Sequence, residues 1–258
     1  MKQFLLPGRY AGEERLTLTG GDFRHLIVVR RLGPGDELPA RDPAGATWLM
    51  RIVSVGAQEC GVTLTPVPDA GSEGGEKRRG PGTRIILLQC LPKGRKIDLI
   101  VRQATEAGVA RIVPLESEHS VVRAGNRDGR AERLVRIARE AVQQSGTPTT
   151  PVIDEPRSLS SLLQSGQDWG TALVFHEKPV DGRSLHHLLA GRPATVSVLI
   201  GPEGGLSDTE LALATGAGFQ TVHFDTGILR VETAATFALG AVMMILQERD
   251  AWRPAQAE

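Results

Sequence analysis

The sequence is poor in cysteine and shows no excess of charge of either sign. Its 258 residues include two cysteines, Cys60 and Cys90, which are too few for a disulfide framework or a zinc cluster built on thiolates. Lys and Arg total 30, as do Asp and Glu, so the formal net charge is zero. Proteins that bind nucleic acid without sequence preference usually carry a basic excess. Any such binding by this chain must therefore come from a local basic patch.

Long apolar runs, signal-like segments and metal-ligand sets are also lacking. The longest nearly unbroken apolar run, Thr233 to Leu246, is shorter than the roughly 20 residues that span a membrane and indicates a buried helix. The start, MKQFLLPGRY, lacks the charged and apolar regions of a signal peptide. The six histidines are scattered, and His186 and His187 would diverge on a helix. We therefore expect a cytoplasmic protein with no metal and no membrane contact.

A segment rich in glycine, proline and charge divides the chain. Residues 68–83, PDAGSEGGEKRRGPGT, have no face that could be buried and are typical of a linker or long exposed loop. The expected domains are therefore residues 1–67 and 84–258. In the first, strand-like composition at 47–55 and 62–65 and a turn at 42–45 predict a small β-barrel. Asp22 is expected to N-cap a short helix whose apolar residues are Phe23, Leu26 and Ile27.

The second domain alternates strand-length apolar runs with helical spacing. The expected strands are 84–90, 111–115, 172–175, 196–200 and 221–224. Two apolar stripes at helical spacing run from Ile97 to Ala104 and from Leu134 to Val142, and Gly108 and Gly146 are placed to end these helices. Near-continuous apolar strands between helices predict an α/β domain whose parallel sheet is covered on both faces.

A glycine-rich loop follows the strand expected at 196–200. In open α/β sheets, ligands bind beyond the carboxyl ends of the strands. Gly201, Gly204 and Gly205 let the backbone approach a ligand closely, and Ser207 with Glu210 matches a capping box that starts a helix. The spacing is neither that of a dinucleotide fingerprint nor that of a P-loop. The loop predicts a small-molecule site, with a merely structural turn as the alternative.

Charged residues mark three further places. Arg230 and Glu232 precede the long apolar run, where both could point from a loop into one pocket; the alternative is a carboxylate favoured by the helix dipole with Arg230 pairing nearby. Basic residues gather at the start of one helix and in the first domain. They include Lys93, Arg95 and Lys96, and Arg24 and Arg31. Such clusters are most often solvated faces, but two in separate domains make RNA binding plausible.

Four segments resemble one family in order and spacing. They are LPKGRKIDLIVRQATEAGVARIVPLESEHSVVR, EAVQQSG, LIGPEGGLSDTE and ILRVETAATFAL. The family is the RsmE family of ribosomal RNA uridine-N3 methyltransferases, which have the SPOUT, or trefoil-knot, fold. HLIVVRRLGPGDEL also resembles that family's PUA-like RNA-binding barrel. The resemblance covers nearly the whole chain and implies a SPOUT-type trefoil-knotted parallel-sheet domain preceded by a small PUA-like β-barrel.

The resemblance also implies a homodimer that uses S-adenosylmethionine to methylate N3 of a uridine in 16S ribosomal RNA. Arg230 and Glu232 would be catalytic, and the basic residues named above would bind RNA. The expected cofactor contacts are Phe175, Ile200, Gly201, Glu203, Gly204, Gly205, Phe224, Ile228, Leu229, Thr233 and Ala234.

The chain departs from the family pattern at three arginines. Histidine stands at position 119, threonine at 147 and glycine at 227. Two alternatives therefore stay open. One is a methyltransferase of the same fold that acts on another RNA, such as transfer RNA. The other is a non-catalytic RNA-binding assembly factor.

Overall fold

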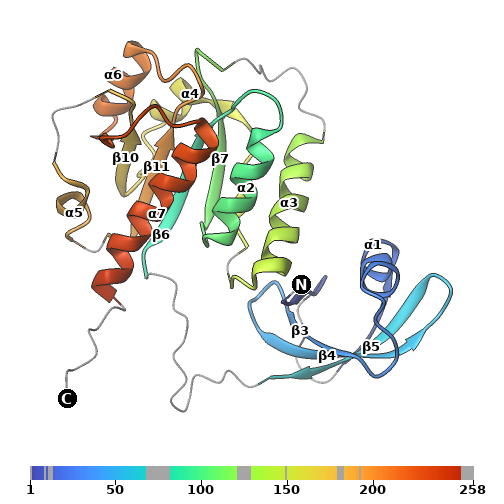
Figure 1. Cartoon of the computed structure of the whole chain (residues 1–258). Coiled ribbons are helices and arrows are strands. Elements are labelled where there is room, and N and C mark those ends of the chain that lie inside the picture. Colours follow the sequence, from blue (N-terminus) through green and yellow to red (C-terminus); the bar gives the residue numbers. More distant parts are fainter. Residues whose placement is uncertain are drawn as a thin grey trace, which may run out of the picture. The chain divides into compact units, whose positions relative to one another are not determined.

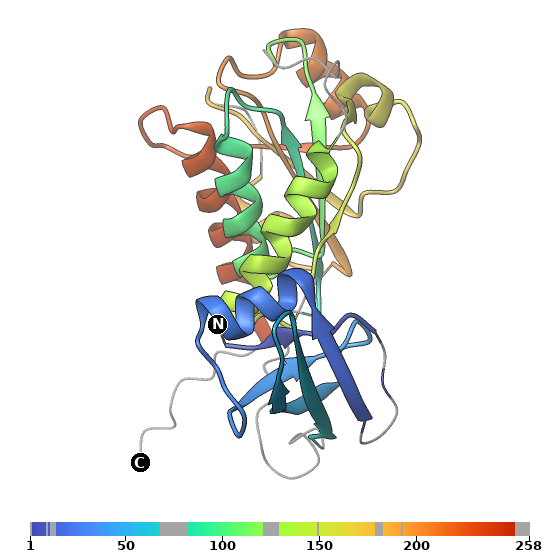
Figure 2. The same cartoon turned by 90° about the vertical axis from the view of Figure 1, so that its right-hand side faces the viewer.

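The chain divides into two compact units. A computed structural model describes residues 2–8, 10, 14–67, 82–120, 129–148, 150–178, 183–191 and 193–250, without the side chains of 249 and 250. One unit comprises Met1–Arg78 with Val142–Pro148, and the other comprises Arg79–Ala141 with Thr149–Glu258. Nearly all of the linker expected at 68–83 lies outside the described residues. Figures 1 and 2 show the chain from two directions.

The first unit is built on a five-stranded sheet in the order β1-β3-β4-β5-β2. The strands are β1 (Phe4–Leu5), β2 (Glu14–Thr19), β3 (Glu37–Arg41), β4 (Thr47–Val55) and β5 (Glu59–Pro66). Alternate side chains of β4, namely Trp48, Met50 and Ile52, are buried in a core shared with the other strands. This period of two follows from the pleat of a strand with one covered face, and it confirms the strands expected here.

The helical segment of the first unit begins earlier than the sequence predicts. It comprises α1 (Gly20–Phe23) and the π-helical η1 (Arg24–Val29). The N-cap is Thr19, so the prediction that Asp22 caps this helix is wrong. Gly20 has a φ of +58°, which lets the chain turn out of β2 two residues before Asp22. Leu26 is fully buried on the sheet, as its position on the apolar face predicts.

The second unit contains a parallel sheet in the order β12-β10-β11-β6-β7-β8, with β9 also paired to β7. The strands are β6 (Arg84–Cys90), β7 (Arg111–Glu116), β8 (Val152–Ile153), β9 (Arg157–Ser158), β10 (Thr171–Phe175), β11 (Thr195–Ile200) and β12 (Gln220–Val222). The expected strand at 221–224 thus ends two residues early. Val222 pairs with Phe175, the last residue of β10, so beyond it β12 has no neighbouring strand.

Helices cover both faces of this sheet (Figure 1). The helices α2 (Lys96–Glu106), α3 (Arg130–Ser145) and α7 (Val231–Asp250) lie on one face, and α4 (Leu159–Leu163) and α6 (Asp208–Gly216) lie on the other. A short helix, α5, spans Leu185–Leu188. Along β6, Ile85 and Leu87 enter the core with α2 and α7, whereas Ile86 and Leu88 enter the core with α4. The expected two-sided burial is confirmed.

Helix α7 is long and apolar enough to cross a membrane by length and composition alone. Its residues Val231, Ala235, Leu239 and Val242 are instead buried in the core beside α2. The helix is therefore a core element of the second unit, as the sequence predicts.

Both cysteines are buried and unbridged, one in each unit. Burial raises the pKa of Cys60, and it raises the pKa of Cys90 to about 12 even though Ser117 stabilises the Cys90 thiolate by a hydrogen bond. Both thiols are thus protonated at neutral pH.

Candidate active site

Three strand ends lie side by side at one edge of the parallel sheet. Phe175 at the end of β10 is in register with Ile200 at the end of β11 and with Val222 at the end of β12. The segments that follow these residues therefore begin next to one another. They include the glycine loop, defined here as residues 201–207, and the arginine loop, defined as residues 225–230. The sheet brings together the segments that the sequence singles out.

The glycine loop needs its glycines for steric reasons. Gly205 has a φ of +70°, and a Cβ atom there would lie 2.9 Å from Oε1 of Glu177. A Cβ atom on Gly204 would lie 3.0 Å from the Cβ atom of His119. A side chain at either position would thus displace a neighbour, and at Gly205 it would also strain the backbone. Glycine at these two positions therefore avoids both the displaced neighbours and the strain.

A segment far away in the sequence supports the glycine loop. Glu210 is 7% exposed; its Oε2 accepts a hydrogen bond from the Ser207 N–H at 3.1 Å, and its Oε1 accepts one from the Glu118 N–H at 2.8 Å. With the Ser207 side chain accepting from the Glu210 N–H, this confirms the predicted capping box. Nδ1 of His119 lies 3.1 Å from the carbonyl oxygen of Gly204 and 3.2 Å from that of Gly205. His119, one of the three positions at which the sequence departs from the family that it resembles, therefore contacts the loop backbone.

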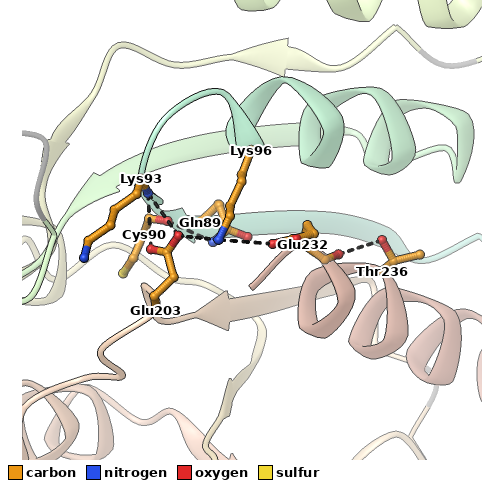
Figure 3. Close-up of polar contacts among 7 residues, drawn as sticks. All are labelled: Gln89, Cys90, Lys93, Lys96, Glu203, Glu232 and Thr236. Atoms are coloured by element: carbon orange, nitrogen blue, oxygen red, sulfur yellow. Dashed lines mark hydrogen bonds and ion pairs between the residues drawn. The ribbon is translucent and has the colours of Figure 1, made fainter. Parts of the chain in front are cut away.

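One lysine bridges the glycine loop and helix α7 (Figure 3). Glu203 accepts hydrogen bonds from the Lys93 N–H at 3.1 Å and from Nζ of Lys96 at 2.8 Å. Nζ of Lys96 also lies 3.7 Å from Oε2 of Glu232. The side chains of Lys96, Glu203 and Glu232 are 36%, 26% and 18% exposed. Glu203 and Glu232 thus both interact with the Lys96 ammonium, and all three side chains are only partly exposed to solvent.

The contact between Lys96 and Glu203 favours the charged form of both side chains. Burial acts to raise the pKa of Glu203, but hydrogen bonds from Lys96 and from backbone N–H groups outweigh it, and the pKa lies below its usual value. The hydrogen bond to Glu203 raises the pKa of Lys96, aided by the charges of Glu203 and Glu232 and opposed by desolvation and by Arg230. At neutral pH, Lys96 and Glu203 therefore form an ion pair.

Arg230 and Glu232 do not lie in one loop. Because α7 begins at Val231, Glu232 stands in its first turn, where the helix dipole favours a carboxylate. Arg230 precedes the helix with an exposed side chain, and its carbonyl oxygen accepts a bond from the Ala234 N–H at 2.8 Å. The charged group placed next to Glu232 is Lys96 rather than Arg230. Oε2 of Glu232 and Oε1 of the fully buried Gln89 belong to a larger set of buried side-chain atoms that have no hydrogen-bond partner among the described residues.

The two aromatic cofactor candidates pack against each other at the strand ends. The ring centroids of Phe175 and Phe224 lie 5.1 Å apart, and Phe224 meets Phe237 at 4.9 Å. Phe237 was not foreseen from the sequence, although it lies one helical turn beyond Thr233 and so shares its face. Ile228 is 92% exposed. Of the others, Ile200 is buried, Thr233 is exposed, and partial burial is found for Gly201, Leu229 and Ala234.

The cations expected to bind RNA are exposed, apart from the bridging Lys96. Lys93 and Arg95 lie just before α2. In the first unit, Arg31 has a φ of +58°, and Arg24 lines an open cavity of about 680 Å³. In the part of the chain that the structure describes, no group of three or more His, Cys, Asp and Glu side chains is placed to hold a metal ion.

Comparison with known proteins matches both units. The family model of an RNA methyltransferase domain matches residues 79–243, and that of an RNA methyltransferase PUA domain matches residues 18–64. The ribosomal RNA small subunit methyltransferases E of Bacillus subtilis and Mycobacterium bovis are 28% and 30% identical over 233 and 243 residues. These matches cover 88% of this chain and 88% of the first relative, and 90% of this chain and 87% of the second.

A solved structure extends the likeness to the fold. The ribosomal RNA small subunit methyltransferase E of Neisseria gonorrhoeae, bound to S-adenosyl methionine, matches with a TM-score of 0.78 and 25% identity, over 95% of this chain and 98% of that one. The expected fold class, a parallel-sheet α/β domain preceded by a PUA domain, is confirmed. The chain belongs to the RNA methyltransferase family with an N-terminal PUA domain, the RsmE family that its sequence resembles.

Proposed function

We propose that this protein transfers a methyl group from S-adenosylmethionine to N3 of a uridine in 16S ribosomal RNA. The observation that carries the proposal is the meeting of three features at one sheet edge in a chain of this family. They are the open backbone of the glycine loop, the exposed Arg230 and the carboxylate of Glu232. Relatives named as ribosomal RNA small subunit methyltransferases support the choice of RNA.

The residues at this edge fit S-adenosylmethionine. The glycine loop begins next to Phe175, which packs on Phe224, and Ile228 of the arginine loop is exposed. Backbone groups with apolar side chains nearby suit a ligand with a polar purine edge and an apolar thioether region. When bound, the cofactor supplies a methyl group activated on a sulfonium. The chain itself then has to position the target base and manage its proton.

Uridine N3 carries a proton that must leave before or during methyl transfer. Arg230 stabilises the negative charge that develops on the carbonyl oxygens flanking N3, a role worth about 10²–10³ in rate by analogy with an oxyanion donor. Its exposed position just before α7 leaves it accessible to a base. Glu232 accepts the proton or orients the group that does.

RNA is held by exposed cations in both units. Because N3 lies on the pairing edge of uracil, the target base must be unpaired or flipped out of its stack. Lys93 and Arg95 in the second unit and Arg24 and Arg31 in the first contact the surrounding phosphates. Affinity for RNA should therefore fall steeply as salt rises. The expected place of action is the cytoplasm, where the small ribosomal subunit is found.

The protein is expected to act as a homodimer of two copies of this chain. On α7, Phe237 is 47% and Met244 is 59% exposed, and Leu99 on the neighbouring α2 is 44% exposed. Phe237 packs on Phe224, which directly precedes the arginine loop, and Ile228 of that loop is also exposed. A homodimer would cover them. Sedimentation analysis should give twice the chain mass, and Phe237→Ser with Met244→Lys should give the single-chain mass.

Methyl incorporation from labelled S-adenosylmethionine into unmodified small ribosomal subunits tests the proposal, with digestion of the product to nucleosides. The expected product is 3-methyluridine. Incorporation into transfer RNA instead, under the same conditions, would contradict the proposed substrate. Cofactor binding in calorimetry without transfer to either RNA would point to a non-catalytic assembly factor.

A further inference from the structure

The basic residues at the start of α2 differ in their surroundings. Figure 3 shows the side chain of Lys93 extending away from the carboxylates of Glu203 and Glu232, while that of Lys96 reaches between them. Lys93 contributes its backbone N–H to Glu203, and its ammonium lies outside the bridge in Figure 3. Lys96 contributes the charge itself, at 2.8 Å from Glu203 and 3.7 Å from Glu232. The cluster therefore contains cations of two kinds.

Lys96 is poorly suited to hold a phosphate. Its single positive charge already faces two negative ones, so a phosphate that approached it would be repelled by Glu203 and Glu232 at short range. The hydrogen bond to Glu203 raises the pKa of Lys96 above its usual value, although the charge of Arg230 acts to lower it. Lys96 is therefore suited to pair with the carboxylates of its own chain and not with an RNA phosphate.

The shielded oxygen of Glu232 needs a donor that Lys96 can supply. Oε2 of Glu232 is buried without a hydrogen-bond partner among the described residues, and the nearest cation is the Lys96 ammonium. An ammonium has three donors, so Lys96 can serve Glu232 without leaving Glu203. A movement of about 1 Å would bring the 3.7 Å contact to hydrogen-bond length.

We propose that Lys96 is a positioning residue for methyl transfer: its ammonium holds the carboxylate of Glu232 in place and links it to Glu203 of the glycine loop. The inference rests on the proposed function. Glu203 stands on the loop expected to hold the cofactor, and Glu232 stands on the helix expected to act on the base. The Lys96 side chain thereby links the position of the cofactor loop to the position of the Glu232 carboxylate.

The test compares five variants with the wild type in the small-subunit assay, measuring kcat, KM for the cofactor, and RNA affinity with its salt dependence. They are Lys96→Gln, Lys96→Arg, Glu232→Gln, the double variant Lys96→Gln with Glu232→Gln, and Arg102→Gln. Arg102 is an exposed cation on the same helix, outside the bridge, and serves as the charge-matched control.

Lys96→Gln should lower kcat about tenfold or more while RNA affinity and its salt slope stay within about twofold of the control. Lys96→Arg should restore most of the loss. In the Glu232→Gln background, removal of Lys96 should cost less than about twofold further, because a residue that acts through another shows strong non-additivity. Unchanged kcat with weakened, less salt-sensitive RNA binding would overturn the proposal, as would additive losses in the double variant.

A readout that needs no activity separates this inference from the proposed function. The side-chain carboxyl resonance of Glu232 in protein labelled with ¹³C-glutamate can be assigned by its loss in Glu232→Gln. It should shift in Lys96→Gln and stay in place in Arg102→Gln. If the wild type methylates no RNA, the proposed function fails, while the resonance still decides whether Lys96 holds Glu232. A resonance that ignores Lys96→Gln would overturn the link.

Discussion

The glycine loop and the arginine loop follow neighbouring parts of one sheet but are held in different ways. The glycine loop is fixed by partners distant in sequence, including Lys96 on Glu203 and the His119 ring on two carbonyl oxygens. In the arginine loop, the hydrogen bonds of Thr226 are local, to Phe224 and Gly227, and Ile228 is almost fully exposed. The glycine loop is therefore preorganised, whereas the exposed side chains of the arginine loop can contact a ligand.

This difference suggests a division of labour. A preorganised loop loses little conformational entropy on binding, which suits the recognition of a cofactor. A loop with few partners can adjust around a large substrate before it places Arg230. Changes in the glycine loop should therefore affect stability and cofactor binding together, and changes in the arginine loop should affect the reaction and leave stability alone.

The largest effect is expected from Arg230→Ala. Because its side chain is exposed outside the core, the substitution should leave the unfolding midpoint unchanged. The methyl-transfer rate should fall about 10²- to 10³-fold, as for the loss of a charge-stabilising donor. Single-turnover kinetics with saturating cofactor measure this loss. An unchanged rate with intact cofactor affinity would remove Arg230 from the mechanism.

A pair of glycine substitutions tests whether the loops differ in rigidity. Gly205→Ala places a Cβ atom on a backbone with a φ of +70° and should cost about 1–2 kcal/mol of unfolding free energy. At Gly227 the φ angle is not positive, and an added Cβ atom would have no neighbour within 4 Å. Gly227→Ala should therefore change the unfolding free energy by less than about 0.5 kcal/mol. Thermal or urea unfolding measures both. Equal destabilisation would contradict the contrast between the loops.

A smaller effect is expected from Ile228→Ser. The side chain is 92% exposed, so stability should not change. If the cofactor buries this side chain, its removal should weaken cofactor binding by about tenfold, the equivalent of about 1.4 kcal/mol. Calorimetric titration gives the affinity. Val152→Ser, at an exposed apolar position on β8, is the matched control and should bind the cofactor normally.

The smallest effect concerns pH. The pKa of Glu203 is lowered from its usual 4.5, so the bridge contributes stability above that value and loses it as pH falls through the lowered pKa. The pKa of Lys96 is raised from 10.5, so the contribution is present below 10.5 and is lost as pH rises through the raised pKa. The small difference in unfolding midpoint between wild type and Glu203→Gln should be constant between these limits and vanish in strong acid. A difference that grew in acid would have the wrong sign.

Much of the fold could be predicted because periodicity reports burial directly. The runs that became β6 and α2 are apolar at the spacing that their cores require. The start of the first helix was missed because it depends on the conformation of Gly20, which no apolar pattern encodes. The end of β12 was missed because it depends on where a neighbouring strand stops.

The site was harder to predict, since its geometry depends on contacts between distant segments. The capping box of Glu210 is local and was foreseen, but its bond to the Glu118 N–H spans 92 positions and was not. In the sequence, Lys96 cannot be told apart from its basic neighbours Lys93 and Arg95, because a sequence gives the charge of a side chain and not the direction in which it points. The two carboxylates that it bridges come from segments 107 and 136 positions further along the chain. No pattern of spacing would have identified them as partners.

Because both native thiols are buried, a fluorescent reporter can be attached selectively to an introduced cysteine. Cys90 and Cys60 have raised pKa values and little access to solvent, so maleimide dyes should react with them slowly. A cysteine introduced in place of the exposed Ile228 would then be labelled selectively. Its fluorescence would report directly, in real time, whether the arginine loop closes when cofactor or RNA arrives.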